Sequence, residues 1–387
     1  MKRKNILMTL LALFPLVSCV YPFSIETPEG SGSMVIDGDI LIGGISGISV
    51  SVSQPLAGEN VYHVPQCQVW VEAEDGKTYN GISTDNALYH VDLMNADPGV
   101  RHKLCVKNSS SGKQYESDWC EVTAAPTVER LSHRLAEDNE TVELGISAHG
   151  NGKESHYRWT YTETWEYHSF YEAKFYYVPP TAKSSGYIAN FTDRENIYYC
   201  WTSRPSSDIM IFDTSLQSEN RFEDLDFLSI PCRDNRLSVL YHIEVYVEAI
   251  NEDSYRYWNN IRTNSGSSGD LLSPMPSSMR GNIHCIGNPD ENVIGYVNAA
   301  YVASAEMWID NDKTGYYLVD RSSVDLPEAI AAEDWYSAYM YKNMRPVDLE
   351  VNITGGEDVT WAAANCVDCR LSGGTKEKPS YWPNDHI

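Results

Sequence analysis

The sequence predicts a mainly β protein, in which an N-terminal β-sandwich of the immunoglobulin or transthyretin type precedes a larger β-rich domain with one or two short helices. Three observations support this fold class. Apolar and polar residues alternate along short segments such as Ile48–Ser53, as they do in a half-buried strand. Turn sequences such as Asp75-Gly76 separate these segments. Hydrophobic residues make up 42% of the 387 residues, which is typical of a folded protein and argues against an acidic disordered chain.

The first 18 residues have the pattern of a lipoprotein signal peptide. Three basic residues precede an apolar run from Ile6 to Val17, which is too short to span a bilayer as a helix. The run ends in Leu16-Val17-Ser18-Cys19, which resembles a bacterial lipobox. We therefore expect Cys19 to be lipidated and to become the first residue of the mature chain.

The residues after Cys19 predict attachment to the outer membrane. They lack the Asp that, in enterobacteria, resembles a signal for retention in the inner membrane. The first acidic residue is Glu26, whereas lipoproteins exported to the cell surface often carry acids directly after the Cys. The leaflet, facing the cell surface or the periplasm, therefore stays open. Residues 19–34, which include Pro28, Gly30 and Gly32, predict a flexible tether.

Residues 35–125 predict the sandwich domain, because their signals are all β. The alternation in Ile48–Ser53 predicts one strand, and Val69–Ala73 leads into the Asp75-Gly76 turn of a hairpin that continues at Thr78. Further strands are predicted over Ala87–Leu93, Leu104–Lys107 and Tyr115–Val122. The region of Pro126 is the predicted domain boundary.

Residues 126–387 predict the larger β-rich domain. Asn251 is placed to cap a helix that continues through Ile261. A second short helix is predicted within Pro327–Lys342, followed by an irregular tail. The predicted strands are Thr141–Ser147, Tyr157–Tyr167, Phe170–Val178, Ile209–Phe212, Leu237–Ile250 and one or two within Gly295–Ile309.

Eight cysteines remain after the lipidated one, and their even number in an exported chain predicts up to four disulfides. Their connectivity stays open, although a turn near Ser110–Gly112 argues against a direct Cys105–Cys120 pair. The sequence Cys366-Val367-Asp368-Cys369 predicts a structural disulfide that holds the tail, with redox and metal-binding roles as alternatives. The candidate disulfide cysteines are Cys67, Cys105, Cys120, Cys200, Cys232, Cys285, Cys366 and Cys369.

An aromatic segment between residues 157 and 177 is the candidate ligand or partner surface. Aromatic rings can stack on sugars or form the centre of an interface. The alternative is that these rings fill a sandwich core and cover a neighbouring strand. The candidate surface residues are Tyr157, Trp159, Tyr161, Trp165 and Tyr167.

Motifs for catalysis, metals and cofactors are not found, so we predict a non-enzymatic protein without a cofactor or metal. The sequence has no HExxH, GxSxG, P-loop or GxGxxG. Glu163 and Glu166 are three residues apart, which in a strand places them on opposite faces and separates them as an acid–base pair. The segment Asp310–Gly315 begins like a calcium loop, but Arg321 stands where an EF-hand needs Glu, so a polar turn is the preferred interpretation.

Several motifs together resemble one protein family. They are Tyr157-Arg158-Trp159, Glu163-Thr164-Trp165-Glu166, Cys200-Trp201-Thr202-Ser203, Tyr255 with Tyr257-Trp258, Gly281-Asn282-Ile283, Gly295-Tyr296, and the tail from Cys366 through Gly373-Gly374 and Lys378-Pro379 to Trp382. In this order they resemble the Bacteroidetes outer-membrane lipoprotein family called domain of unknown function 4249 (DUF4249), over nearly the whole mature chain. The resemblance implies a partnership with a TonB-dependent outer-membrane receptor, but it provides no catalytic residues and names no substrate.

The predicted function is that of a non-enzymatic outer-membrane lipoprotein, an accessory or ligand-binding subunit of a TonB-dependent uptake system. Two alternatives stay open: a structural or adhesive cell-surface lipoprotein, and a glycan or peptide hydrolase. The formal charge of −25 argues against nucleic acid as a partner, since a phosphate backbone is held by a net basic surface.

Overall fold

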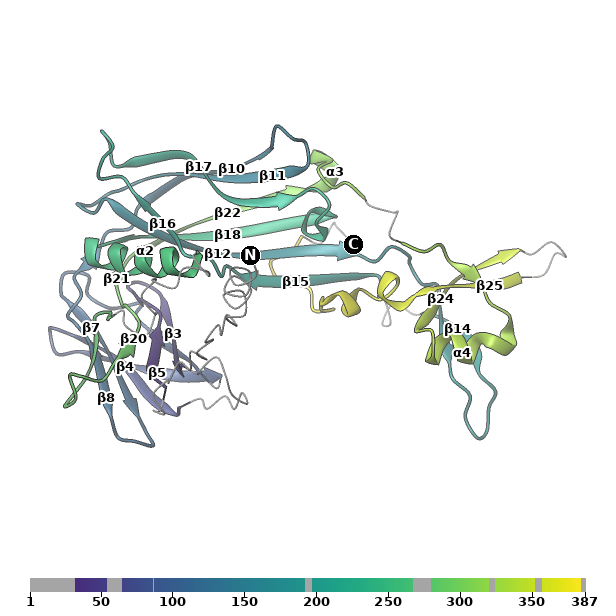
Figure 1. Ribbon diagram of the computed structural model, residues 1–387, viewed down its shortest axis with the longest axis horizontal. Helices are drawn as coiled ribbons and strands as arrows, with labels where there is room; N and C mark the ends of the chain where they lie inside the picture. The colour runs from purple at the N-terminus through teal and green to yellow at the C-terminus, as the bar shows by residue number, and fades with distance from the viewer. Residues whose placement is uncertain are drawn as a thin grey trace, which may run out of the picture.

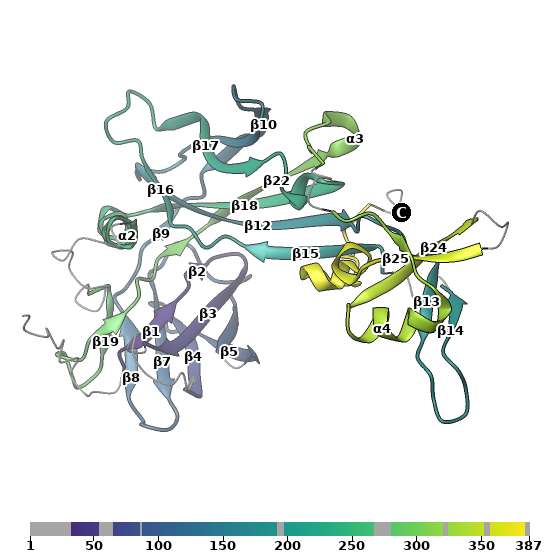
Figure 2. The same cartoon turned by 45° about the vertical axis from the view of Figure 1, so that its right-hand side comes forward.

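The computed structural model describes residues 32–53, 65–85, 87–191, 197–266, 280–319, 324–351 and 357–383. The described chain is mainly β with short helices, as the sequence predicts. The molecule is elongated, with an N-terminal unit, a central unit and a C-terminal arm (Figure 1). Figure 2 shows that the long strands of the central unit extend from the N-terminal unit to the arm. The predicted signal peptide, Cys19 and most of the tether lie outside the described residues.

The N-terminal unit is a sheet that wraps around one core. The order of the nine strands assigned to it in the described chain is β19-β8-β7-β4-β5-β6-β3-β1-β20, and the two end strands contact each other. The alternation predicted around Ile48 is confirmed, because Ile48 and Val50 are fully buried while Ser49 between them is only half-buried. The early strands are β1 (Met34–Asp37), β2 (Ile40–Leu41), β3 (Ile45–Val52), β4 (Cys67–Ala73), β5 (Thr78–Asp85), β6 (Leu88–Asp92), β7 (His102–Asn108), β8 (Gln114–Ser117) and β9 (Val122–Thr123).

A later part of the chain returns to complete this unit. Strand β19 (Ile283–Cys285) pairs with β8, and β20 (Val293–Ile294) lies parallel to β1. Strand β21 (Ala299–Ala300) inserts between β2 and β9. The predicted boundary at residue 125 therefore describes the unit incompletely, because strands from residues 283–300 share its core. Local sequence signals cannot show that a distant strand pairs with an early one.

Two glycines make this return possible. A Cβ on Gly281 would lie 1.6 Å from the carbonyl oxygen of Gly295, and one on Gly295 would lie 1.9 Å from that of Ile36. Gly295 also has a φ of +144°, which side chains rarely allow. The motifs Gly281-Asn282-Ile283 and Gly295-Tyr296 are thus explained by close backbone packing between the returning segment and β1.

The central unit is a sandwich of two sheets. One sheet has the order β15-β12-β18-β22, with β16 also paired to β12, and the other has the order β10-β11-β17. Side chains from β11, β12, β17, β18 and β22 share the core between them. The elements are β10 (Thr127–Leu135), β11 (Thr141–His149), β12 (His156–His168), β15 (Tyr199–Pro205), β16 (Met210–Asp213), β17 (Arg221–Pro231), η2 (Asn235–Leu237), β18 (Leu240–Ile250), β22 (Val302–Asp310) and α3 (Asn311–Thr314).

The predicted helix after β18 is confirmed as α2 (Glu252–Gly266). Asn251 caps it, because its side-chain oxygen accepts a hydrogen bond from the Ser254 amide at 2.8 Å. Tyr257 is buried and packs on Tyr296, with ring centroids 5.4 Å apart. Within the described part of the chain, no helix has the length and apolar character needed to cross a membrane.

The C-terminal arm is a small, separate cluster of strands and helical turns at the far end of the central unit (Figure 1). Its core is formed by Trp361, Tyr177 and Ala338, and the predicted second helix is present as α4. The tail was predicted to be irregular, and this is wrong for residues 344–351 and 357–363, which form two paired strands. The arm contains β13 (Phe175–Val178), β14 (Tyr187–Asn190), β23 (Glu328–Ala329), η4 (Ala332–Asp334), α4 (Trp335–Met340), β24 (Met344–Val351), β25 (Glu357–Ala363), η5 (Ala364–Cys366) and η6 (Cys369–Ser372).

Candidate functional site

The candidate aromatic surface lies mostly in the interior. Tyr157, Trp159 and Tyr161 are at most 5% exposed, because alternate residues of β12 point into the core of the central sandwich. Tyr167 is 4% exposed and packs on the Cys200–Cys369 disulfide, and Trp165 is half-buried beneath the Arg204 guanidinium. These five residues therefore do not form an exposed binding surface, and the core interpretation holds for the part of the segment that lies in β12.

The cysteines form one disulfide within the described residues, between Cys200 of β15 and Cys369 of η6. A structural disulfide holds the tail, as predicted, but the CxxC motif does not close on itself: Cys369 pairs with Cys200, and Cys366 is free. The tail is held to β15 instead, and this attachment also fixes η6 against Tyr167, whose hydroxyl donates to the Cys369 carbonyl. The remaining candidates are free thiols in the structure: Cys67, Cys105, Cys120, Cys232, Cys285 and Cys366.

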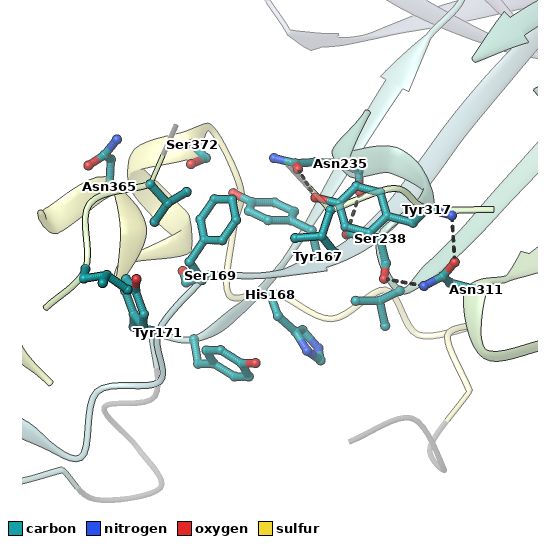
Figure 3. A pocket seen from close by; sticks show the side chains of 16 residues that line it. Tyr167, His168, Ser169, Tyr171, Asn235, Ser238, Asn311, Tyr317, Asn365 and Ser372 are labelled. Atoms are coloured by element: carbon teal, nitrogen blue, oxygen red, sulfur yellow. Dashed lines mark hydrogen bonds between the residues drawn. The ribbon is translucent and has the colours of Figure 1, made fainter. Parts of the chain in front are cut away.

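A cleft of about 580 Å³ lies where the central unit meets the C-terminal arm. The end of β12 forms its floor with Tyr167, His168 and Ser169 (Figure 3). Asn365 of the arm and Asn235 of η2 lie on opposite sides of this floor (Figure 3). The volume falls within the range of about 300–1,000 Å³ that is typical of small-molecule sites.

Hydrogen bonds hold the wall of the cleft that comes from the central unit. The side-chain amide of Asn311 donates to the Ser238 carbonyl at 3.3 Å, and its oxygen accepts from the backbone N–H of Tyr317 at 3.0 Å. The Tyr317 hydroxyl donates to the side-chain oxygen of Asn235 at 3.3 Å, and the Ser238 hydroxyl donates to the Asn235 carbonyl at 2.7 Å. Asn311 itself begins α3, whose cap is Asp310, so the predicted polar turn is a capped turn of helix.

The opposite wall is attached by backbone hydrogen bonds and by one phenol. The Tyr171 amide donates to the Cys366 carbonyl at 3.0 Å, and the Tyr171 hydroxyl donates to the Asp325 carbonyl at 3.1 Å. The Ser169 amide donates to the Tyr198 carbonyl at 2.7 Å. Burial raises the pKa of Tyr198 and of Tyr167, so both phenols remain protonated at neutral pH.

The side chains that line the cleft carry no permanent charge. Its lining contains no Asp, Glu, Lys or Arg, and combines aromatic rings with amides, hydroxyls and aliphatic side chains. Three members of the predicted aromatic segment, Tyr167, Phe170 and Tyr171, belong to this lining, and Phe170 is 43% exposed. The arrangement suits a ligand that exchanges hydrogen bonds and covers an apolar ring.

The neighbours His168 and Ser169 do not form a nucleophilic pair. His168 Nε2 lies 2.9 Å from the Glu166 carboxylate, but the buried Ser169 hydroxyl has no hydrogen-bond partner in the structure. A serine nucleophile needs a hydrogen bond to its histidine base. Elsewhere in the described chain, no three His, Cys, Asp or Glu side chains are arranged to hold a metal ion.

Glu163 and Glu166 point to opposite faces of β12, as predicted. Glu163 accepts from Arg204, Arg236 and Tyr241, whereas Glu166 accepts from Trp382 at 2.7 Å and pairs with His168. Both carboxylates are at most 1% exposed. Each therefore belongs to a separate buried network of hydrogen bonds.

Most residues of the cleft carry no signal in the sequence. Phe170 and Tyr171 belong to the predicted aromatic segment, but of the five candidate surface residues only Tyr167 lines the cleft. Tyr198, Asn235, Asn311, Tyr317 and Asn365 come from segments far apart in the chain, and no local motif connects them. Only the tertiary fold brings these amides and phenols together.

Comparisons with known proteins give a family but no activity. A family model described as domain of unknown function (DUF4249) matches residues 20–306, which end within β22, so most of the arm lies outside the match. Among solved structures, the chain is similar to a segment of two fibronectin type III domains from chicken tenascin, at 11% identity and a TM-score of 0.17, over 57% of this chain and 92% of that chain. No curated protein matches. Because the family model covers well over half of the sequence, this chain belongs to the DUF4249 family.

Proposed function

We propose that this protein is a non-enzymatic, lipid-anchored outer-membrane protein that serves as a ligand-binding or accessory subunit of a TonB-dependent uptake system. The observation that carries the ligand-binding role is the neutral cleft between the central unit and the C-terminal arm. The anchor is supported by the lipobox-like sequence that ends in Cys19. The partnership with a receptor is supported by the resemblance to the Bacteroidetes lipoprotein family.

The chemistry of the cleft favours binding over hydrolysis. A glycosidase needs two carboxylates on either side of the scissile bond, and the lining of this cleft offers none. A serine hydrolase needs a base for its hydroxyl, and Ser169 has no such contact. Apart from His168, which pairs with Glu166, the polar groups that are present are amides, hydroxyls and phenols, which donate and accept hydrogen bonds without changing charge.

The position of the cleft suits a subunit that is tethered at its other end. The described chain begins at residue 32, just before β1 of the N-terminal unit. Arg158, near the start of β12, contacts that unit, and His168 at the other end of β12 lies in the cleft. Ten residues of strand separate them, which corresponds to roughly 33 Å. The cleft is therefore held well away from the point where the tether joins.

Affinity purification of the full-length protein from membranes tests this proposal. With a C-terminal tag and mild detergent, we expect a TonB-dependent receptor, identified by mass spectrometry, to co-purify. The Cys19→Ser variant should lose metabolic labelling by a fatty acid, leave the membrane fraction and lose the receptor. Recovery of lipidated, membrane-bound protein without any such receptor would contradict the accessory role, and an unlabelled wild-type protein would contradict the anchor.

A further inference from the structure

We propose that the cleft at the end of β12 binds a neutral, hydroxyl-rich ligand that has an apolar face, which is the chemistry of an oligosaccharide. The inference rests on the proposed ligand-binding function and specifies the class of ligand. Three properties of the cleft support it: its lack of charge, its unused amide donors and its exposed aromatic ring.

The lack of charge in the cleft selects against ionic ligands. The chain has 21% charged residues, yet none of the 16 residues that line the cleft is Asp, Glu, Lys or Arg, and the one imidazole among them, His168, faces the Glu166 carboxylate (Figure 3). Glu166 stands behind the floor, but its two oxygens are occupied by His168 and Trp382. A charged ligand would lose hydration in the cleft without gaining an opposite charge, which is unfavourable.

The amides of the cleft match hydroxyl groups. Asn235 uses its side-chain oxygen to accept from Tyr317, while none of the hydrogen bonds found in the described residues uses its amide nitrogen. The same holds for the amide nitrogen of Asn365, across the floor of the cleft. An amide presents two donors and one acceptor, and a sugar hydroxyl both donates and accepts, so one ligand can satisfy both sides.

An exposed ring completes the cleft. Phe170 lines the cleft and is 43% exposed, whereas its neighbours Tyr167 and Ser169 are buried. Two aliphatic residues of the lining, Val319 and Leu326, are also at least half exposed. Exposed apolar side chains beside amide donors match a sugar, whose C–H face packs on aromatic rings while its hydroxyls form hydrogen bonds.

Calorimetric titration of the full mature protein tests the ligand class. The probes are neutral hexasaccharides of α-1,4-glucose, β-1,4-glucose, β-1,4-xylose and β-1,4-mannose, an anionic heparin hexasaccharide, and a neutral tetra-alanine peptide blocked at both ends. We expect at least one neutral sugar to bind with a Kd below about 1 mM, and the heparin fragment and the peptide to bind at least tenfold more weakly.

Two variants locate the binding. Asn235→Ala should weaken binding of the sugar about fivefold or more, because one or two hydrogen bonds are lost. Phe170→Ala should weaken it about tenfold, while Phe170→Trp keeps a ring and restores it. The matched controls are Asn80→Ala on the exposed side of β5 and Tyr187→Ala on β14, which should change the Kd by less than twofold.

The possible results separate this inference from the proposed function. If no neutral sugar binds although a receptor co-purifies with the full-length protein, the ligand class is wrong and the accessory function stands. If a sugar binds but Asn235→Ala and Phe170→Ala have no effect, the cleft is not its site, and the inference fails. Tighter binding of the heparin fragment or the peptide than of every neutral sugar overturns the inference as well.

Discussion

Single residues of β12 show how this fold accommodates buried charge. Glu163 lies on the core-facing side of the strand and is 1% exposed. Arg236 and the Tyr241 hydroxyl donate to one of its oxygens at 2.7 and 2.9 Å, and Arg204 donates to the other at 2.9 Å. Burial, and then the charge of Glu163, raises the pKa of Tyr241 well above its usual value, so the phenol remains a donor. An isolated carboxylate at this position would be strongly unfavourable.

The substitution Glu163→Gln should lower the free energy of unfolding by about 2–3 kcal/mol, because the buried Arg236 loses one of its two carboxylate partners and keeps only Asp234. Urea denaturation at neutral pH measures this loss. The matched control is Glu223→Gln, since Glu223 is 67% exposed and its pair with Arg221 is at the surface. That control should cost less than about 1 kcal/mol. Equal effects of the two variants would show that the Glu163 network is not a major source of stability.

The residues of β12 also show what the sequence can and cannot predict. The pattern Tyr157, Trp159, Tyr161 predicted a one-sided aromatic strand, and this is confirmed, but the pattern does not tell whether that side faces a core or solvent. The answer depends on β11 and β17, which pack opposite. The cleft depends even more on distant contacts, because Asn235 and Asn365 reach it from segments 130 residues apart.

Among the elements, those with strong local signals were predicted well. Strand β18 has a long apolar run, and α2 has a capping Asn251, so both were found from the sequence. Strands β10 and β17 were missed because their exposed positions carry charges and form surface ion pairs, such as that of Arg130 with Asp224. Strand β24 includes Pro346, which disfavours a strand assignment from sequence alone.

Among the contacts between elements, the disulfide that joins η6 to β15 supports the cleft. It connects residues 169 positions apart, and closing a loop of that length restricts the unfolded chain strongly. Cys369→Ala should therefore lower the free energy of unfolding by about 2–5 kcal/mol, as measured by denaturant titration under non-reducing conditions. Cys366→Ala, three residues away and free in the structure, is the matched control and should cost less than about 2 kcal/mol. If reduction leaves the stability of the wild type unchanged, the disulfide does not support the arm.

The first turn of η6 gives a prediction about pH. Asp368 caps the turn and accepts from Arg370 at 2.6 and 2.8 Å. Burial acts to raise the pKa of Asp368, but the hydrogen bonds from Arg370 outweigh it, and the pKa is lowered. A lowered pKa in the folded state means that the stabilisation is present above the unfolded value, about 3.9, and is lost as pH falls through the folded value.

Asp368→Asn should therefore be less stable than wild type by about 1–2 kcal/mol at pH 6, and the difference should begin to shrink below about pH 4 and disappear once the pH is below the folded pKa of Asp368. Urea titrations between pH 2.5 and 6 measure this convergence. Arg370→Gln should reduce the same pH dependence, because it removes the cation that lowers the pKa. A difference between Asp368→Asn and wild type that is constant with pH would contradict this account.

At the scale of the whole molecule, one buried ion cluster joins the N-terminal and central units. Arg158 of β12 bonds to Asp39, which follows β1, and to Glu248 of β18 at 2.6 Å. Asp39 also accepts from the backbone and side chain of Asn298 in the returning segment. The Arg158 guanidinium lies over the Trp258 ring of α2, 4.7 Å from its centroid. The cluster connects three distant parts of the chain.

Arg158→Met should separate the unfolding of the two units, because it leaves two buried carboxylates without a countercharge at their contact, at a cost of about 3–5 kcal/mol. Differential scanning calorimetry should then show two transitions or one broadened transition. Adding Asp39→Asn and Glu248→Gln removes the uncompensated charges and should restore much of the stability. An unchanged single transition in Arg158→Met would show that other contacts join the units.

The return of residues 283–300 to the N-terminal unit has a consequence for the order in which this protein can fold. A ribosome makes about 5–20 residues per second, so β8 is complete roughly 10–30 s before its partner β19 exists. During that interval β1 and β8 are paired on one side only, with β3 and β7, and their other edges are open to aggregation. The early half of the chain therefore cannot finish folding as it is synthesised, and it depends on staying unfolded or protected until most of the protein has been made.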